Sequence, residues 1–76
     1  MGLSTCGRMV IEVEQYHPDG FYYGGNVAVE WDDDTGYVDG EMLGRMYANS
    51  SLSEREVERL EEELIEIAID EFKSNV

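Results

Sequence analysis

Cysteine, proline and long apolar runs are scarce in this chain of 76 residues, which contains one Cys and one Pro. The single thiol, Cys6, excludes an internal disulfide framework and a multi-cysteine metal centre, and it favours a reducing compartment. No apolar stretch approaches the roughly 20 residues that span a bilayer, and no segment resembles the apolar centre of a signal peptide. We therefore expect a protein of the cytoplasm that does not enter a membrane.

Basic side chains are also scarce, with 5 Lys and Arg against 18 Asp and Glu, which gives a formal net charge of −13. Such a charge argues against direct binding to DNA, RNA or anionic lipid, because those polyanions attract basic surfaces. The chain should nevertheless fold as a single small domain over residues 1–76, since 42% of it is hydrophobic and disorder needs low hydrophobicity as well as high charge. Basic proteins remain as the partners that this charge favours.

The hydrophobic pattern of the first half predicts an antiparallel β-meander of three strands over residues 8–39. Apolar and polar residues alternate between 8 and 16, which places the apolar ones on one face of a strand. Residues with strong turn preferences at 17–20 and 32–36 separate the three strands. The pair Gly24-Gly25 predicts a bulge or a sharp bend in the middle strand.

The second half is predicted to be helical. A short helix is expected over residues 41–49. The apolar side chains that would bury one side of it are Met42, Leu43 and Met46. A long helix is expected over residues 53–73, because a Ser-x-x-Glu capping box precedes an apolar pattern of helical period. The expected fold is α+β, with both helices covering one face of the sheet and with residues 1–7 flexible.

The long helix carries an apolar arc of roughly 200°, wider than the roughly 100° stripe that covers one sheet. Either the short helix packs against the excess, or part of the arc forms an interface with another molecule. The second explanation includes a homodimer through Ile65, Ile69 and Phe72. It also includes an alternative function, in which the protein is an acidic adaptor or small regulatory subunit whose partner binds this arc.

Three patterns that could signal a chemical site have simpler explanations. Asp34-Thr35-Gly36 matches the tripeptide of retroviral-type aspartic proteases, but charged neighbours replace the apolar strands that such a site needs. The acidic run 32–41 misses the EF-hand pattern at three of its defining positions, so weak Ca²⁺ or Mg²⁺ binding is kept only as a third hypothesis. Cys6 and His17 are the single thiol and imidazole, and Cys6 lies in the segment expected to be flexible. We expect no enzyme activity, no cofactor and no resident metal.

The acidic residues are the main evidence for function. The helix over 53–73 would be about 31 Å long at ~1.5 Å per residue and carries nine acids, or one carboxylate per about 3.5 Å. This spacing is close to the roughly 3.4 Å between phosphates along one DNA strand. Tyr22 and Tyr23 flank the predicted bend and could serve either the core or an interface. A second acidic group at one end of the sheet comprises Glu30, Asp32, Asp33, Asp34, Asp39 and Glu41.

Three features of the chain are its run Asp32-Asp33-Asp34, its acidic stretch from Glu54 to Glu66 and its low content of Lys and Arg. In these features the chain resembles small phage-encoded inhibitors that mimic DNA, the anti-restriction and anti-CRISPR proteins. The resemblance covers the general character of the chain and no sequence motif. It implies a non-enzymatic inhibitor that occupies the basic nucleic-acid-binding surface of a defence complex in the host cytoplasm. The residues expected to contact that partner are Glu30, Asp32, Asp33, Asp34, Asp39, Glu58, Glu62, Glu63, Glu66, Asp70, Tyr22 and Tyr23.

Overall fold

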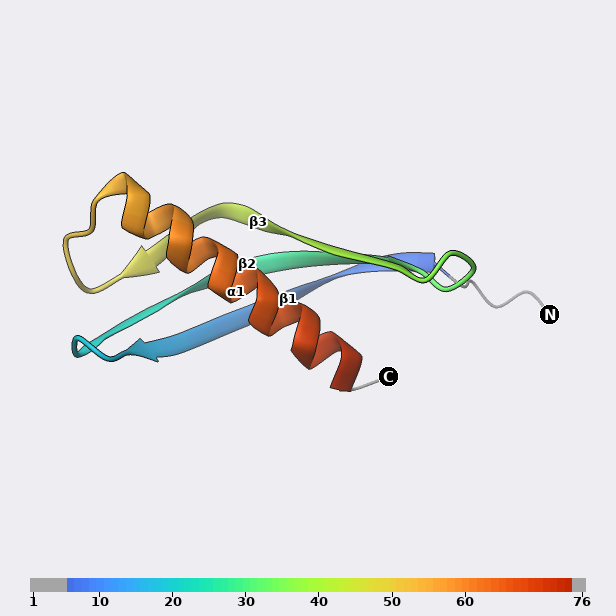
Figure 1. The fold of residues 1–76 in the computed structure, drawn as a ribbon, viewed down its shortest axis with the longest axis horizontal. Coiled ribbons are helices and arrows are strands. Elements are labelled where there is room, and N and C mark those ends of the chain that lie inside the picture. Colours follow the sequence, from blue (N-terminus) through green and yellow to red (C-terminus); the bar gives the residue numbers. More distant parts are fainter. Residues whose placement is uncertain (1–5, 75–76) are drawn as a thin grey trace.

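The computed structural model describes residues 6–74, which form three strands and one helix (Figure 1). The antiparallel strands β1 (Cys6–His17), β2 (Phe21–Asp32) and β3 (Tyr37–Ala48) pair in the order β1-β2-β3. The helix α1 (Glu54–Ser74) crosses one face of this sheet diagonally. The molecule is elongated, with extents of 50 × 20 × 16 Å. The predicted α+β class and the antiparallel meander are confirmed.

The two turns of the meander form where the sequence predicts them. In the first, the Gly20 N–H donates to the His17 carbonyl oxygen over 2.8 Å, and Gly20 has a φ of 96°. In the second, the Asp34 N–H donates to the Asp32 Oδ1 atom over 2.9 Å, and Gly36 has a φ of 73°. Residues with a Cβ atom rarely adopt such positive φ values, so glycine is the natural residue at both positions.

The predicted short helix over residues 41–49 is wrong, because β3 continues to Ala48. A helix of about two turns is marginal in water on its own, whereas this segment gains a ladder of hydrogen bonds by pairing with β2. Met42 and Met46 still pack against the core. The strand therefore buries two of the three side chains expected on the buried side of a helix, whereas Leu43 pairs with Asn26 and faces away from α1.

The register between β2 and β3 shifts at the Gly-Gly pair of β2, where an irregularity is expected, but the additional residues lie in β3 and β2 itself is continuous. Gly24 pairs with Tyr47 and Asn26 with Leu43, so a step of two residues in β2 faces a step of four in β3. Gly44, within the longer step, has a φ of 72°, and β3 curves in this region (Figure 1). Because the insertion has an even number of residues, alternate residues on either side of it keep facing α1.

The core lies between α1 and the sheet face that it crosses. Val27, Val29 and Leu64 are its largest fully buried side chains. α1 packs directly on the backbone of β3 at Gly40, where a Cβ atom would meet the Ile65 Cγ2 atom at 2.9 Å. Within residues 6–74 no further element covers the opposite face of the sheet.

α1 begins where the capping box predicts. The Glu56 N–H donates to the Ser53 Oγ atom over 3.3 Å, and the Ser53 hydroxyl donates to the Glu56 Oε1 atom over 3.2 Å. The first bond satisfies a backbone N–H that the helix start leaves without an intrahelical partner, and the second joins the two side chains. The helix predicted over 53–73 is confirmed to within one residue at each end. Of the segment 1–7 expected to be flexible, 1–5 lie outside the described residues, and the last two residues begin β1.

We expect Leu64→Ala to lower the free energy of unfolding by about 2–5 kcal/mol, the usual loss when a buried leucine leaves a cavity. The matched control is Glu62→Ala on the exposed side of the same helix, which should change that free energy by less than about 0.5 kcal/mol. Denaturant titration followed by circular dichroism measures both. A Leu64→Ala variant as stable as the unsubstituted protein would contradict the described packing of α1.

Candidate partner-binding surfaces

The sheet face turned away from α1 is exposed and acidic, and we call it the outer face. Successive side chains of a strand point to opposite faces of the sheet. Val27 and Val29 are buried under α1, so the residues adjacent to them in β2, and the register partners of those residues in β1 and β3, lie on the outer face. Arg8 lies on this face as the register partner of Glu30. The acidic residues of the outer face are Glu12, Glu14, Glu30, Asp32, Asp39 and Glu41.

The acids nearest to the second turn form what we call the acidic end of the outer face. It comprises Glu30, Asp32, Asp39 and Glu41. Glu30 and Asp39 are direct register partners, and like charges directly opposite one another destabilise a sheet. The Tyr37 hydroxyl donates to the Asp39 Oδ2 atom over 3.2 Å, and this bond raises the pKa of Tyr37. Among the described residues, none of the four acids forms an ion pair with Arg or Lys, although Arg8 is the register partner of Glu30 on the other side.

The opposite end of the outer face carries exposed rings, which we call the tyrosine cluster: Tyr16, Tyr22 and Tyr47. Tyr16 and Tyr22 are register partners whose ring centroids lie 4.9 Å apart at an interplanar angle of 65°. Tyr47 reaches across Gly24, and its hydroxyl donates to the Glu14 Oε2 atom over 2.8 Å. That hydrogen bond raises the pKa of Tyr47. The three side chains are 59%, 49% and 45% exposed, respectively.

α1 carries a second acidic surface on the opposite side of the molecule, and we call it the helix row. It comprises Glu58, Glu62, Glu66 and Asp70, all exposed and each four residues from the next. Successive carboxylates are therefore separated by about 6 Å of helix rise, and like charges at this spacing oppose helix formation. Arg55, Arg59 and Lys73 lie on the same helix, so the sign of its charge is more mixed than that of the acidic end.

The residues predicted to contact a partner therefore divide between two surfaces. Glu30, Asp32, Asp39 and Tyr22 lie on the outer face, and Asp33 and Asp34 lie in the adjoining turn. The helix row lies on α1, which covers the other face of the sheet. The structure does not bring the two acidic groups onto one surface, so a single flat contact cannot use both.

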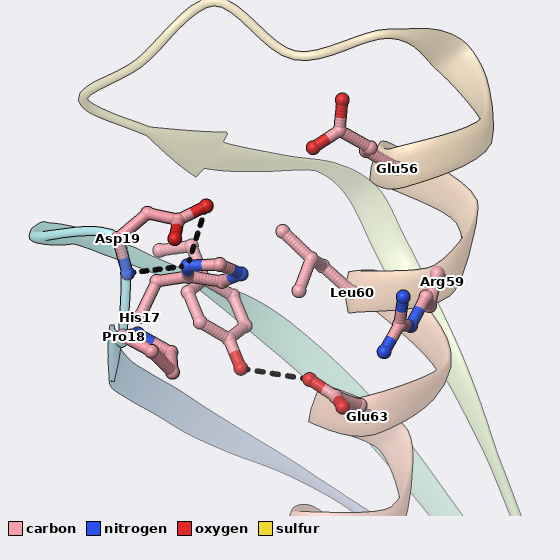
Figure 2. Close-up of a pocket in the computed structure, with 8 residues that line it drawn as sticks. His17, Pro18, Asp19, Glu56, Arg59, Leu60 and Glu63 are labelled. Carbon is pink, nitrogen blue, oxygen red and sulfur yellow. Dashed lines mark hydrogen bonds and ion pairs between the residues drawn. The ribbon is translucent and has the colours of Figure 1, made fainter.

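Tyr23 belongs to the core and is not available as the surface anchor that the sequence suggested. Its side chain is 5% exposed, and its hydroxyl donates to the Oε2 atom of Glu63 over 3.0 Å (Figure 2). Burial, followed by the hydrogen bond and the negative charge of Glu63, raises the pKa of Tyr23. Glu63 is itself half-buried, so this predicted contact residue serves the internal structure.

A hollow of about 330 Å³ lies beside this pair, between the first turn and α1 (Figure 2). His17 stacks on Phe21 at a ring-centroid distance of 4.4 Å. Its Nδ1 atom accepts the Asp19 N–H over 3.0 Å, a bond that needs this nitrogen unprotonated.

Cys6 begins β1 and His17 ends it, about 36 Å apart at ~3.3 Å per residue. The thiol and the imidazole therefore cannot act as a nucleophile–base pair.

No metal site is formed within residues 6–74, since no three His, Cys, Asp or Glu side chains are placed to hold an ion. Near the second turn, the Asp32 carboxylate instead accepts the Asp34 N–H. The hypothesis of weak Ca²⁺ or Mg²⁺ binding therefore has no set of ligands in this part of the chain.

The described residues also include no helix long and apolar enough to cross a membrane.

Comparison of the chain with protein-family models, with curated protein sequences and with solved structures finds no match. The resemblance to small acidic inhibitors stays a prediction. The candidate surfaces follow from the strand register and from the exposure of the chain's own side chains.

Sequence reasoning missed two members of the tyrosine cluster as surface residues, Tyr16 and Tyr47. The alternation in β1 contained the signal for Tyr16, because it continues the polar positions Glu12 and Glu14. Tyr47 was hidden by the predicted short helix. Tyr47 lies on the outer face because β3 pairs with β2, and no local sequence pattern predicts this pairing.

We expect Tyr23→Phe to make the stability of the protein less sensitive to alkaline pH. A pKa raised in the folded state means that the stability contributed by Tyr23 is complete below pH 10, its unfolded value, and is lost as pH rises through the folded value. Chemical denaturation at several pH values above 9 measures this loss. Tyr37 and Tyr47 titrate in both proteins and provide a common background, so equal losses in the two proteins would contradict the assignment.

Proposed function

We propose that this protein is a non-enzymatic acidic inhibitor that binds the basic nucleic-acid-binding surface of another protein or complex by charge mimicry. The observation that carries this proposal is the acidic end of the outer face. Its four carboxylates have no ion-pair partners among the described residues, and Glu30 directly opposes Asp39 in the sheet. Such an arrangement lowers the stability of the free protein. A cationic partner would remove that repulsion, which makes the acidic end a natural contact surface.

The acidic end is compact, and the adjoining turn extends it. Outward-facing side chains follow one another at about 6.6 Å along a strand, and neighbouring strands are about 4.8 Å apart. Asp33 and Asp34 continue the negative charge into the exposed turn between β2 and β3, at the extremity of the molecule (Figure 1). A patch of this kind presents a dense array of anions to a groove that otherwise holds phosphates.

The inhibitory role follows from the charge of the whole chain. A net charge of −13 opposes contact with nucleic acid itself and favours cationic surfaces. A cationic groove built for DNA or RNA cannot hold both its nucleic acid and this protein, so occupancy would block it. The defence complexes of a host cell are the partners that the resemblance to phage-encoded inhibitors suggests. Attraction between such surfaces acts at long range and weakens with salt.

The alternative, an adaptor or homodimer contact through the apolar arc of α1, has little free surface to use. The centre of the arc, at Leu60, Leu64 and Ala68, is buried against the sheet. Ile65 and Ile69 pack beside the backbone of β3 at its Gly40 position, and the Phe72 ring centroid lies 4.8 Å from that of Trp31. The alternative stays a prediction, and no observation in the structure favours it over the acidic end.

We expect the protein to displace labelled duplex DNA from a nucleic-acid-binding defence complex at about 50 mM salt, and far less at about 200 mM. Purified restriction endonucleases and RNA-guided nucleases are the complexes to use, and fluorescence anisotropy of the DNA measures its release. The salt dependence follows from the ionic nature of the contact. An unchanged anisotropy with every complex at both salt concentrations would contradict the proposed function.

Two variants of equal charge show which surface makes the contact. The acidic-end variant combines Glu30→Gln, Asp32→Asn, Asp39→Asn and Glu41→Gln. The helix-row variant combines Glu58→Gln, Glu62→Gln, Glu66→Gln and Asp70→Asn. Each removes four negative charges and changes the net charge from −13 to −9. We expect the acidic-end variant to need at least about tenfold more protein for half-maximal displacement, and the helix-row variant less than about threefold more. Equal losses would show that total charge, and not the acidic end, drives binding.

A further inference from the structure

The tyrosine cluster is a group of large exposed side chains that the core does not use. Tyr23 is buried in the core, whereas Tyr16, Tyr22 and Tyr47 each expose about half of their side-chain surface. The three rings occupy neighbouring rows of the sheet, because Tyr16 pairs with Tyr22 and Tyr47 pairs with the residue two positions further along β2. Contiguous exposed rings on an uncovered face are typical of protein-interaction sites.

The charges beside the rings indicate the chemistry of the partner. Glu14 accepts the Tyr47 hydroxyl with its Oε2 atom, which leaves its Oε1 atom outside that bond. Glu12 follows on the same face of β1 and is exposed. Rings next to basic residues would suit the bases and phosphates of a nucleic acid. Rings next to carboxylates suit a cation instead.

Arginine is the cationic side chain that satisfies both features of this site. Its planar guanidinium can stack on a tyrosine ring and at the same time donate hydrogen bonds, in the guanidinium plane, to a neighbouring carboxylate. The ammonium group of lysine is a point charge with a stronger hydration shell, and it cannot form the same planar stack. The combination of rings and carboxylates therefore favours arginine over lysine.

A second copy of this chain is a poor occupant of the same surface. Each copy carries a net charge of −13, and two outer faces in contact would bring carboxylates against carboxylates. The basic residue that the register places on this face, Arg8, is opposite Glu30 and far from the rings. Charge complementarity thus points to a partner of a different kind.

We propose that the tyrosine cluster, together with Glu12 and Glu14, binds an arginine-bearing segment of a protein partner. The rings provide the stacking surface and the two carboxylates accept hydrogen bonds from the guanidinium groups. The inference does not rest on the proposed function, because it requires neither displacement of nucleic acid nor the acidic end of the face.

The test compares two peptides of equal charge, hexa-arginine and hexa-lysine, each titrated into the full chain at about 50 mM salt. Isothermal titration calorimetry gives the affinities, and amide chemical shifts of the ¹⁵N-labelled protein give the location. We expect hexa-arginine to bind at least about fivefold more tightly than hexa-lysine. Its largest shifts should fall at the tyrosine cluster. Equal affinities, or arginine-induced shifts confined to α1, would overturn the proposal.

Variants of the rings separate stacking from general charge attraction. Tyr16→Leu/Tyr22→Leu keeps apolar side chains on both strands but removes the π-faces, and it should bind hexa-arginine about tenfold more weakly with no preference over hexa-lysine. Tyr16→Phe/Tyr22→Phe keeps the rings and should retain that preference, whether or not the leucine variant folds well. Tyr37→Leu, at the other end of the same face, is the matched control and should change the affinity less than about twofold.

Two outcomes would contradict the proposal in this series. The first is loss of the arginine preference in the phenylalanine variant, which would show that the rings do not supply the selectivity. The second is a dimer of the unsubstituted protein in sedimentation analysis. If Tyr16→Phe/Tyr22→Phe leaves that dimer intact and Tyr16→Leu/Tyr22→Leu dissociates it, the tyrosine cluster is a self-association surface. The acidic-end variant keeps all three rings, and the ring variants keep the acidic end. Loss of arginine selectivity can therefore be told apart from loss of DNA displacement, which tests the proposed function.

Discussion

The packing of one helix against one face of the sheet is the constraint on which the remaining structure depends. A chain of 76 residues supplies enough apolar surface for a single core, and that core lies between α1 and the valines and methionines that face it. Gly40 permits close approach of the helix to β3. Because no other described element covers the sheet, the outer face has to be compatible with water, as is usual for an antiparallel sheet with one covered face.

The outer face satisfies that requirement with acidic side chains, and the chain as a whole carries more negative charge than solubility needs. A net charge of −13 exceeds the magnitude of about 2–8 that suits a small soluble domain, and Glu30 and Asp39 are placed where their charges repel most directly. The acidic end and the tyrosine cluster lie at opposite ends of the same face, and Tyr22 and Glu30 are about 26 Å apart along β2 at ~3.3 Å per residue.

Local patterns in the sequence predicted the two turns, the first two strands and the long helix, because each depends on residues close together in the chain. The segment 41–49 was not predictable in this way. Met42 and Met46 are four positions apart, a spacing that one helix face and one strand face share, so only pairing with β2 decides between them. Tyr23 is predicted as a contact residue because a bend at the glycine pair would break the alternation of the strand. In the structure β2 runs continuously to Asp32, and Tyr23 faces α1 in step with the buried valines.

At the acidic end, Glu30 and Asp39 oppose each other at a cost in stability. The most direct test is the free energy of unfolding of the variant Asp39→Asn, which keeps the Arg8–Glu30 pair, relative to the unsubstituted protein, at about 0.01 M and about 1 M salt, where the screening length falls from about 30 Å to about 3 Å. We predict that the variant is more stable by about 0.2–1 kcal/mol at low salt and that the difference disappears at high salt. A variant of equal or lower stability at low salt would contradict the account.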